Sequence, residues 1–458
     1  MTANDAPATA ATVVARSTAA DLRLVRFLYC DCGSIVRGKA THTAHLAGRL
    51  TEGIALVRGQ MAMNALDHLQ PVPDMGAVGE VRLVPDPESF AILPYVPRTG
   101  SMMSDLYRLD REPWEVCPRT FLRRMIARAA AAGMRVEAAF EHEFYLGRLD
   151  ADGAVVPFDR SLCFATTGMD GAARFTDDLL EALEAQGLQP EQALAEYGAG
   201  QQEVSVRHAD ALRAADNQIR VRETARAVAA RHDLVASFAA KPFPDEIGSG
   251  SHLHLSLWDT TTGANLLHDA EATPTGFSRT GRRFVAGLLE HLPALTAIMC
   301  PTVNSFRRLQ PHAWASAFVC YGFDNREAAV RIPSPFWGRE QGTTNIEVKT
   351  VDNTCNPYLA LGAVIAAGLD GIENRLDPGP PLAVDPGLLS DDERFDLSIG
   401  RLPTSLDQAL NLLAADPVLT GALGAPLTEV FLAVRRSEAD YFRGQPDALE
   451  FAQHLAKY

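Results

Sequence analysis

The sequence predicts an α+β protein with two or more domains. The chain has 458 residues, of which 47% are hydrophobic and 22% are charged, so it can bury a large core. From Leu22 to Tyr95, short apolar runs alternate with turn clusters, which is typical of a small domain rich in strands. From Pro118 onward helical patterns dominate. This change of pattern predicts a domain boundary near residue 115.

The first segment of the chain, residues 1–20, is rich in Ala and Thr and has no apolar core of the kind found in a secretion signal. We expect it to be a disordered tail. No apolar run along the chain reaches the roughly 20 residues that a membrane span needs. The seven cysteines are an odd number and widely scattered, which is typical of reduced thiols. We therefore expect a cytoplasmic protein.

The elements can be predicted in chain order. In the first domain, strands are predicted for Leu24 to Cys30 and Val81 to Leu83. A helix is predicted from Pro118 to Ala132, because proline favours a first helical turn and glycine favours the position after a last one. The later elements are a strand carrying Glu141, a helix from about Asp210 to His232, a strand at His252, a helix near Asn356 to Asn374, a loop from Asp377 to Gly387, and two terminal helices.

The charge balance limits the partners. The formal net charge is -15 and the isoelectric point is near 5.3. Nucleic acid and anionic membranes require a basic surface, so neither is expected as the main partner. Nucleotide phosphates are still compatible with an acidic protein, because metal ions and a few arginines can bind them locally.

Two alternating runs carry side chains that can bind metal. In Phe140–Phe144, Glu141 and Glu143 share one face of an extended strand, while the aromatic residues and His142 share the other. In the run 248–256, His252, His254 and Ser256 would line one face, with leucines packing behind them. Either run alone is weak, because such patterns are common on solvated surfaces.

Further segments fit the same chemistry. Residues 196–203 place Glu196 and Glu203 on either side of a glycine-rich bend, which allows the two carboxylates to converge. Asn345 to Lys349 is another alternating strand, with Asn345, Glu347 and Lys349 on one face. Two basic segments lie at residues 304–311 and 325–333.

In this order and at these separations, the five motifs resemble those of the glutamine synthetase family over nearly the whole chain. The resemblance implies a small N-terminal β-grasp domain at residues 21–115 and a catalytic domain at residues 116–458. The catalytic domain would contain a curved antiparallel sheet with flanking helices. It also implies a homo-oligomer built from hexameric rings, with a dodecamer as the expected assembly.

The resemblance implies two metal ions. One would be bound by Glu143, Glu196 and Glu203, and the other by Glu141, His252 and Glu347. Five carboxylates in one pocket cannot all stay ionised unless divalent cations neutralise them. Oxygen ligands favour Mg²⁺, and the imidazole makes Mn²⁺ a plausible substitute.

In the family, ATP phosphorylates the side-chain carboxylate of glutamate, and an amine then displaces phosphate to give an amide. The resemblance assigns catalytic roles to Arg326, Glu196 and Glu347. It assigns nucleotide contacts to Lys241, His254, Ser256, Arg326, Arg331 and Asn345. It assigns glutamate contacts to Gly248, His252, Arg308 and Lys349.

Three departures concern the amine. Positions that bind and deprotonate ammonium in glutamine synthetases correspond to Val57 or Arg58, to Cys163 and to Trp314. Ammonium needs several acceptors and a nearby negative charge when it leaves water, and these residues offer an apolar, aromatic cavity instead. The sequence therefore predicts an ATP-dependent glutamate–amine ligase that forms a γ-glutamylamide through γ-glutamyl phosphate. Polyamines, ethanolamine, alkylamines and anilines are all candidates, with a monoamine of apolar body slightly favoured.

Alternatives remain at this point. The chain could be an ordinary glutamine synthetase that uses ammonium, with Trp314 only packing in a lid and another acid replacing the lost ones. It could also be a catalytically silent relative with a structural or regulatory role. Lys349 and Asn345 stand where the family has arginines, which leaves open an acid substrate other than glutamate.

Overall fold

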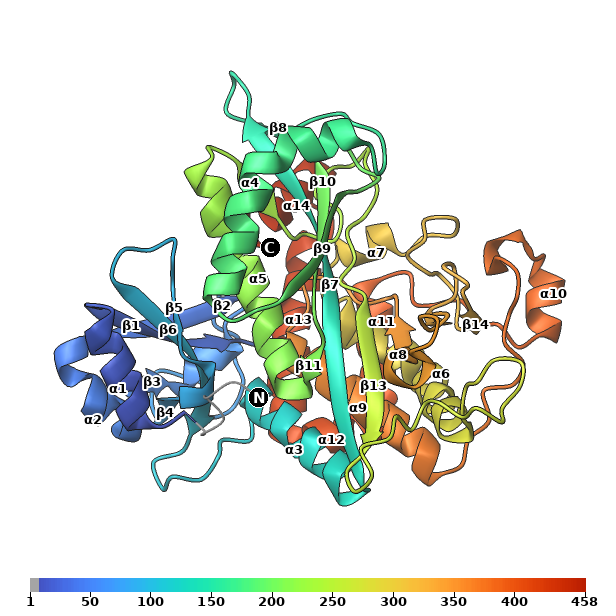
Figure 1. Ribbon diagram of the computed structural model, residues 1–458, viewed down its shortest axis with the longest axis horizontal. Helices are drawn as coiled ribbons and strands as arrows, with labels where there is room; N and C mark the ends of the chain where they lie inside the picture. The colour runs from blue at the N-terminus through green and yellow to red at the C-terminus, as the bar shows by residue number, and fades with distance from the viewer. Residues whose placement is uncertain (1–7) are drawn as a thin grey trace.

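The computed structural model describes residues 8–458 and contains two sheets, one in each domain (Figure 1). The N-terminal sheet has six strands in the order β2-β1-β6-β4-β3, with β5 paired to β6. All its pairs are antiparallel except β1 and β6. The strands are β1 Leu24–Cys30, β2 Val36–His42, β3 Ile54–Val57, β4 Glu80–Pro85, β5 Ala91–Ile92 and β6 Thr99–Tyr107, and helix α2 is Leu46–Glu52.

The prediction of a disordered tail over residues 1–20 is wrong for Ala10–Ala19, because these residues form helix α1. Thr9 and Thr12 make a reciprocal capping box, in which the amide of each donates to the hydroxyl of the other. Val13 and Ser17 are buried, so one side of this helix packs against the domain. Tertiary packing thus stabilises a segment whose composition alone is typical of disorder. Residues 1–7 lie outside the described residues.

The second sheet has ten strands and crosses the centre of the molecule, with the long strand β7 as its axis (Figure 1). Its main path is β14-β15-β16-β13-β7-β10-β9, and β8, β11 and β12 pair with β7 outside this path. Its pairs are antiparallel except β14 with β15. The strands are β7 Met134–Leu149, β8 Val155–Pro157, β9 Pro190–Ala195, β10 Gln201–Val206, β11 Ala209–Asp210, β12 Val235–Ser237, β13 Leu253–Asp259, β14 Tyr321–Phe323, β15 Val330–Ile332 and β16 Ile346–Val348.

Helices surround this sheet and supply most of the core. Helices α6 and α9 pack closely, because Gly287 of α6 lies against α9: a Cβ atom there would be 2.1 Å from the carbonyl oxygen of Ala367. The helices of this domain are α3 Pro118–Ala131, α4 Thr166–Ala185, α5 Ala211–Arg231, α6 Arg279–Met299, α7 Ser305–Arg308, α8 Glu340–Thr343, α9 Pro357–Glu373, α10 Asp391–Asp396, α11 Leu406–Ala415, α12 Pro417–Leu423, α13 Ala425–Phe442 and α14 Asp447–Lys457.

Among the described residues, no single helix is long and apolar enough to cross a membrane. Only α12 and α13 taken together meet the length and composition test, and they are bent by 106° at their junction.

The elements predicted from strong patterns are confirmed to within one or two residues: strand β1 and helices α3, α5 and α9. The prediction of only two terminal helices is wrong, because five helices, α10 to α14, follow the loop that ends at Gly387. Asp416 caps α12, with proline in its first turn, and Gly424 at φ +84° separates α12 from α13. The apolar pattern by itself predicts fewer and longer helices, because it does not show these breaks.

Candidate active site

Charged side chains form a row across five neighbouring strands, β15, β16, β13, β7 and β10. Arg331 lies opposite Glu347, and Glu347 lies opposite His254. The row is interrupted at β7, where Ala139 lies opposite His254; Glu143, four residues farther along β7, lies opposite Glu203 on β10. The predicted alternation is confirmed on β7, where Phe140, His142 and Phe144 are buried while the glutamates between them are partly exposed. The pleat therefore directs the row toward one face of the sheet.

Glu347 is buried at the centre of the row, with two cations against its carboxylate. Arg331 Nη1 lies 2.8 Å from one carboxylate oxygen, and Lys349 Nζ lies 3.3 Å from the other. Burial opposes ionisation, but Lys349 and His254 outweigh it and hold the pKa of Glu347 well below its usual range. Glu347 is therefore ionised at neutral pH, at the buried end of the site.

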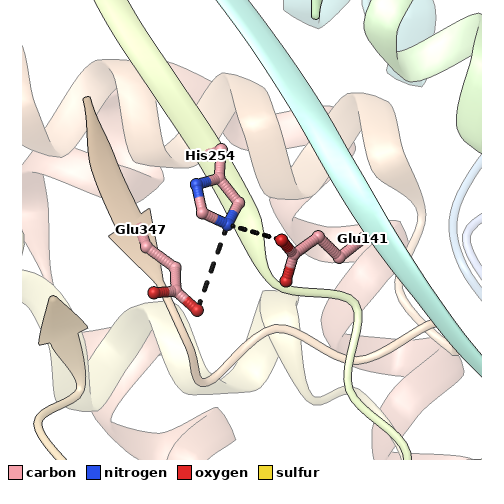
Figure 2. Close-up of side chains that lie close together, drawn as sticks. All are labelled: Glu141, His254 and Glu347. Carbon is pink, nitrogen blue, oxygen red and sulfur yellow. Dashed lines mark ion pairs between the residues drawn. The ribbon is translucent and has the colours of Figure 1, made fainter. Parts of the chain in front are cut away.

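The prediction of a strand at His252 is wrong by one residue, because β13 begins at Leu253. His252, in the loop before β13, and His254, on β13, both reach the carboxylates. His252 Nδ1 is 3.3 Å from Glu141 and 3.5 Å from Glu347, and its Nε2 is 3.6 Å from Glu143. His254 Nε2 is 3.2 Å from Glu141 and 4.0 Å from Glu347 (Figure 2). The predicted set Glu141, His252 and Glu347 is thus brought together. His254, which the resemblance places near the nucleotide, lies in the same cluster, and with Glu141 and Glu347 it forms a group whose ligand atoms lie within 4.8 Å of one another.

Asn345 determines which nitrogen of His254 is available. Its amide nitrogen donates to the carbonyl of Thr343 at 2.9 Å, so its oxygen faces His254 Nδ1, also at 2.9 Å, and accepts the proton there. His254 Nε2 then faces two carboxylates without a hydrogen bond of good geometry. A lone pair between two anions is unfavourable, so Glu141, against the effect of burial, raises the pKa of His254 to about 9, and a proton lies between the ring and the carboxylates unless a metal ion takes its place. The donor set therefore fits a divalent cation.

The second group of predicted ligands also concentrates negative charge. Burial and the neighbouring Glu143 raise the pKa of Glu196 to about 7. Burial, Glu141 and Glu143 likewise raise the pKa of Glu203. Glu143 accepts hydrogen bonds from the amide of Gly250 at 2.8 Å and from Gln201 at 3.3 Å, which fix the orientation of its carboxylate. The crowded carboxylates are the donor set that a hard divalent cation prefers.

Arg308 lies beneath the loop that carries Gly248 and Gly250. It is 3% exposed, and its guanidinium donates to the carbonyls of Lys349 and Thr350 at 2.9 and 3.0 Å. A Cβ atom at Gly248 would be 2.5 Å from Arg308 Cγ, and one at Gly250 would be 2.7 Å from its Nη2. Only glycine permits this approach of the loop to the arginine.

The remaining residues predicted for the nucleotide lie around the row. The backbone of Lys241 is held by Asn304, which accepts from its amide at 2.7 Å and donates to its carbonyl at 2.9 Å. Ser256, farther along β13, accepts a hydrogen bond from Trp258 Nε1 at 2.9 Å. Arg326 lies in the loop between β14 and β15, and its charge opposes the rise in the pKa of Glu196 that burial causes.

The residues predicted to line the amine pocket lie in two separate places. Cys163 and Trp314 lie near Glu196: burial and Glu196 raise the pKa of the Cys163 thiol, and the Trp314 ring is 6.3 Å from that of Tyr197, the residue after Glu196. Val57 lies on β3 in the N-terminal domain, on the other side of the molecule from β13 (Figure 1). Its predicted approach to a neighbouring subunit's site stays a prediction.

Two residues at this end of the site, Tyr197 and Glu327, are not singled out by the sequence patterns. Both stand next to predicted site residues, Glu196 and Arg326, and this adjacency is the only signal that the sequence offers for them. Tyr197 is 60% exposed and faces Trp314, which is 56% exposed. Glu327 is buried and accepts a hydrogen bond from the Trp314 amide at 2.8 Å.

Comparison with known proteins gives the class and the family. The model of the glutamine synthetase N-terminal domain matches residues 8–114, and the model of the glutamine synthetase catalytic domain matches residues 115–454. A protein of Streptomyces coelicolor, gamma-glutamylpolyamine synthetase GlnA3, is 38% identical over 433 residues, which cover 94% of this chain and 92% of that protein. The glutamine synthetase of Mycobacterium bovis is 32% identical over 443 residues, covering 95% and 96% respectively.

A solved structure, described as that of a novel glutamine synthase homolog, has a TM-score of 0.85 and 34% identity, and it covers 95% of this chain and 99% of its own. The protein is therefore an ATP-dependent ligase of a class that uses divalent metal ions. It belongs to the glutamine synthetase family. The predicted fold, a small N-terminal domain followed by a glutamine-synthetase-type catalytic domain, is confirmed.

Proposed function

We propose that the protein joins the γ-carboxylate of glutamate to an organic amine, with ATP and a γ-glutamyl phosphate intermediate. The observation that carries the choice of amine is the pair of aromatic rings, Tyr197 and Trp314, beside Glu196. Rings of this kind favour the hydrocarbon part of an amine, and their faces attract an ammonium head. Ammonium has no hydrocarbon part to bury against the rings, and it needs several hydrogen-bond acceptors instead.

In this proposal, Glu143, Glu196 and Glu203 hold one divalent ion, and Glu141, His252 and Glu347 hold a second. When bound, Mg²⁺ or Mn²⁺ would screen the phosphates of ATP from the acceptor carboxylate. Asn345 and Lys349 support this set, since Asn345 orients His254 and Lys349 keeps Glu347 charged. Glu347 is buried and paired with Arg331 and Lys349, so its ligand oxygens are held in place before any ion arrives.

The chain's arginines serve the phosphoryl transfer and the amino acid. Arg326 and Arg331 are proposed to bind phosphate oxygens and to stabilise the charge that develops on them. Arg331 already contacts Glu347 at 2.8 Å, so it lies directly beside the proposed metal ligands. Arg308, beneath Gly248, is proposed to position glutamate together with Lys349 and His252. Lys241, His254, Ser256 and Asn345 are proposed to form the nucleotide side.

Glu196 is proposed to take a proton from the amine after the amine attacks the acyl phosphate. It lies next to Tyr197 and within electrostatic reach of Cys163 and Arg326. A carboxylate in this place can accept the proton as the C–N bond forms. We also propose that the protein assembles as homo-oligomeric rings, in which Val57 of one subunit completes the amine side of the next. The cytoplasmic location stays a prediction.

The experiment that tests this function measures phosphate release from ATP and Mg²⁺ with glutamate. Ammonium is compared with alkylamines, ethanolamine, polyamines and anilines, and the products are identified by mass. We expect a γ-glutamylamide of one amine class and little glutamine. Glutamine as the main product would assign the protein to ordinary glutamine synthesis and would overturn the role given to the aromatic rings.

A variant gives an independent check of the amine side. Trp314→Glu should weaken the use of organic amines by about 2- to 30-fold in KM, since contact between a cation and a ring is worth roughly 0.5 to 2 kcal/mol. The new carboxylate should also improve the use of ammonium. An unchanged preference between the two would show that Trp314 does not determine selectivity.

A further inference from the structure

The flap, defined here as residues 310–316, has an unusual backbone. His312, Trp314 and Ser316 have φ angles of 59°, 53° and 66°, in the left-handed region that residues other than glycine rarely adopt. Such a conformation persists only where surrounding contacts hold it. Three contacts do so, one at each of these residues.

The first contact is between His312 Nδ1 and the carboxylate of Asp385, at 2.8 Å. The contact at Ser316 is a hydrogen bond from its Oγ to the carbonyl of Ala328, at 2.9 Å. The contact at Trp314 involves a buried carboxylate. The amide of Trp314 donates to Glu327 Oε1 at 2.8 Å, and Glu327 is only 8% exposed. A buried carboxylate needs such partners, so this contact should be the strongest of the three.

Glu327 is itself held by its own loop. Its amide donates to Asn325 Oδ1 at 3.1 Å, and Asn325 Nδ2 donates to the carbonyls of Leu382 and Val384. The residue before it, Arg326, acts electrostatically on Glu196. One short loop therefore connects the flap, through Glu327, with the residue proposed to bind phosphate, Arg326.

We propose that Glu327 is a positioning residue that holds Trp314 opposite Tyr197, and that it thereby sets the selectivity for the amine. This inference rests on the proposed function. Glu327 acts through Trp314 and does not contact the reacting atoms. It is an acid close to the flap position where the family carries one, but it is buried and its Oε1 accepts the Trp314 amide. It therefore does not restore the ammonium site; it fixes the aromatic ring that replaces it.

The test compares Glu327→Ala with Glu327→Gln, which keeps an acceptor oxygen. We expect Glu327→Ala to raise the KM for the preferred amine about tenfold or more, from the loss of a hydrogen bond to a charged group. The KM for ATP should change less than about twofold, and Glu327→Gln should recover most of the loss. A fall in kcat with unchanged amine KM in both variants would overturn the proposal.

A matched control is available at Glu438, a glutamate of similar burial whose carboxylate accepts the amide of Ala65 at 2.8 Å, away from the flap. Glu438→Ala should lower Tm but leave the amine KM unchanged. If it raises the amine KM as much as Glu327→Ala does, the effect is one of general stability and the proposal fails.

A second readout does not depend on the amine activity. The chain has four tryptophans, so labelling with 5-fluorotryptophan gives four ¹⁹F signals, and Trp314→Phe identifies the one from Trp314. Glu327→Ala should shift and sharpen that signal, and Glu327→Gln should not. An unchanged signal in Glu327→Ala refutes the positioning role. A changed signal in a protein that shows no amine turnover would instead mean that the proposed function has failed while Glu327 still holds the flap.

Discussion

Replacing Glu203 by glutamine should change the stability of the protein in opposite directions without and with a divalent cation. Glu203 lies opposite Glu143 on the neighbouring strand, and burial, Glu141 and Glu143 raise its pKa. Side chains that face each other across an antiparallel pair have Cβ atoms about 5 Å apart, and like charges there are destabilising. The two carboxylates therefore oppose folding until a cation lies between them.

The magnitude follows from this geometry. Two unit charges about 5 Å apart repel by roughly 3 kcal/mol at an effective dielectric constant of about 20. Protonation of one carboxyl relieves part of this, so we expect metal-free Glu203→Gln to be more stable than the wild type by about 1 to 3 kcal/mol. A cation at 100 times its Kd stabilises the wild type by about 2.7 kcal/mol. The variant lacks one ligand and gains less, so the order of stability should reverse.

The assay is Tm by differential scanning fluorimetry, first in EDTA and then across a Mg²⁺ series. Glu143→Gln should behave in the same way, because it removes the other carboxylate of the facing pair. Glu181→Gln, which changes an exposed glutamate on α4, is the control and should show neither effect. A lower Tm for metal-free Glu203→Gln than for the wild type would refute the reasoning. So would an equal gain from Mg²⁺ in both proteins.

Three further predictions concern other parts of the molecule. Glu347→Gln should abolish phosphate release with little loss of folded protein by circular dichroism, because it removes the charge that the proposed metal site and Arg331 share; normal turnover would remove Glu347 from the mechanism. Gly248→Ala should lower kcat/KM by about 100-fold, since its Cβ would meet Arg308 Cγ at 2.5 Å and displace the loop. The control is Gly421→Ala in α12, where the space around the glycine is open, and it should leave kcat/KM unchanged. Burial lowers the pKa of His291, but hydrogen bonds with Asp416 and Asp370 outweigh it and raise that pKa overall. Because the folded pKa is the higher one, the stabilisation is complete below about pH 6.5 and is lost as the pH rises through the folded value. Tm measured from pH 6 to 9 should therefore fall less steeply in His291→Asn, and parallel profiles would exclude this pair as a source of pH dependence.

The fold is predictable where local signals and burial agree. Alternation, apolar period and helix-end residues locate strand β1 and helices α3, α5 and α9. The alternation along β7 alone is enough to predict that Glu141 and Glu143 share one face. Helix α1 escapes prediction because Ala and Thr give no strong pattern, and its stability comes from the burial of Val13 and Ser17.

The site is predictable as a set of residues but not as an arrangement. The motifs, in order, indicate both carboxylate groups and the family to which the chain belongs. They do not place His254 beside Glu141 and Glu347, because that contact depends on the register between β13 and β16 and on the tautomer that Asn345 selects.

The sequence by itself thus determined the family, the domain order, the face that Glu141 and Glu143 share on β7 and the identity of the charged side chains, because these depend on residue type and on spacing within one segment. Only the tertiary structure decided which charges meet and which rings face each other. Glu327 and Trp314 are 13 residues apart, and Tyr197 is far from both in the chain. Their contacts arise when the β14–β15 loop, the flap and the segment after Glu196 come together in the folded chain, and no local pattern encodes that proximity.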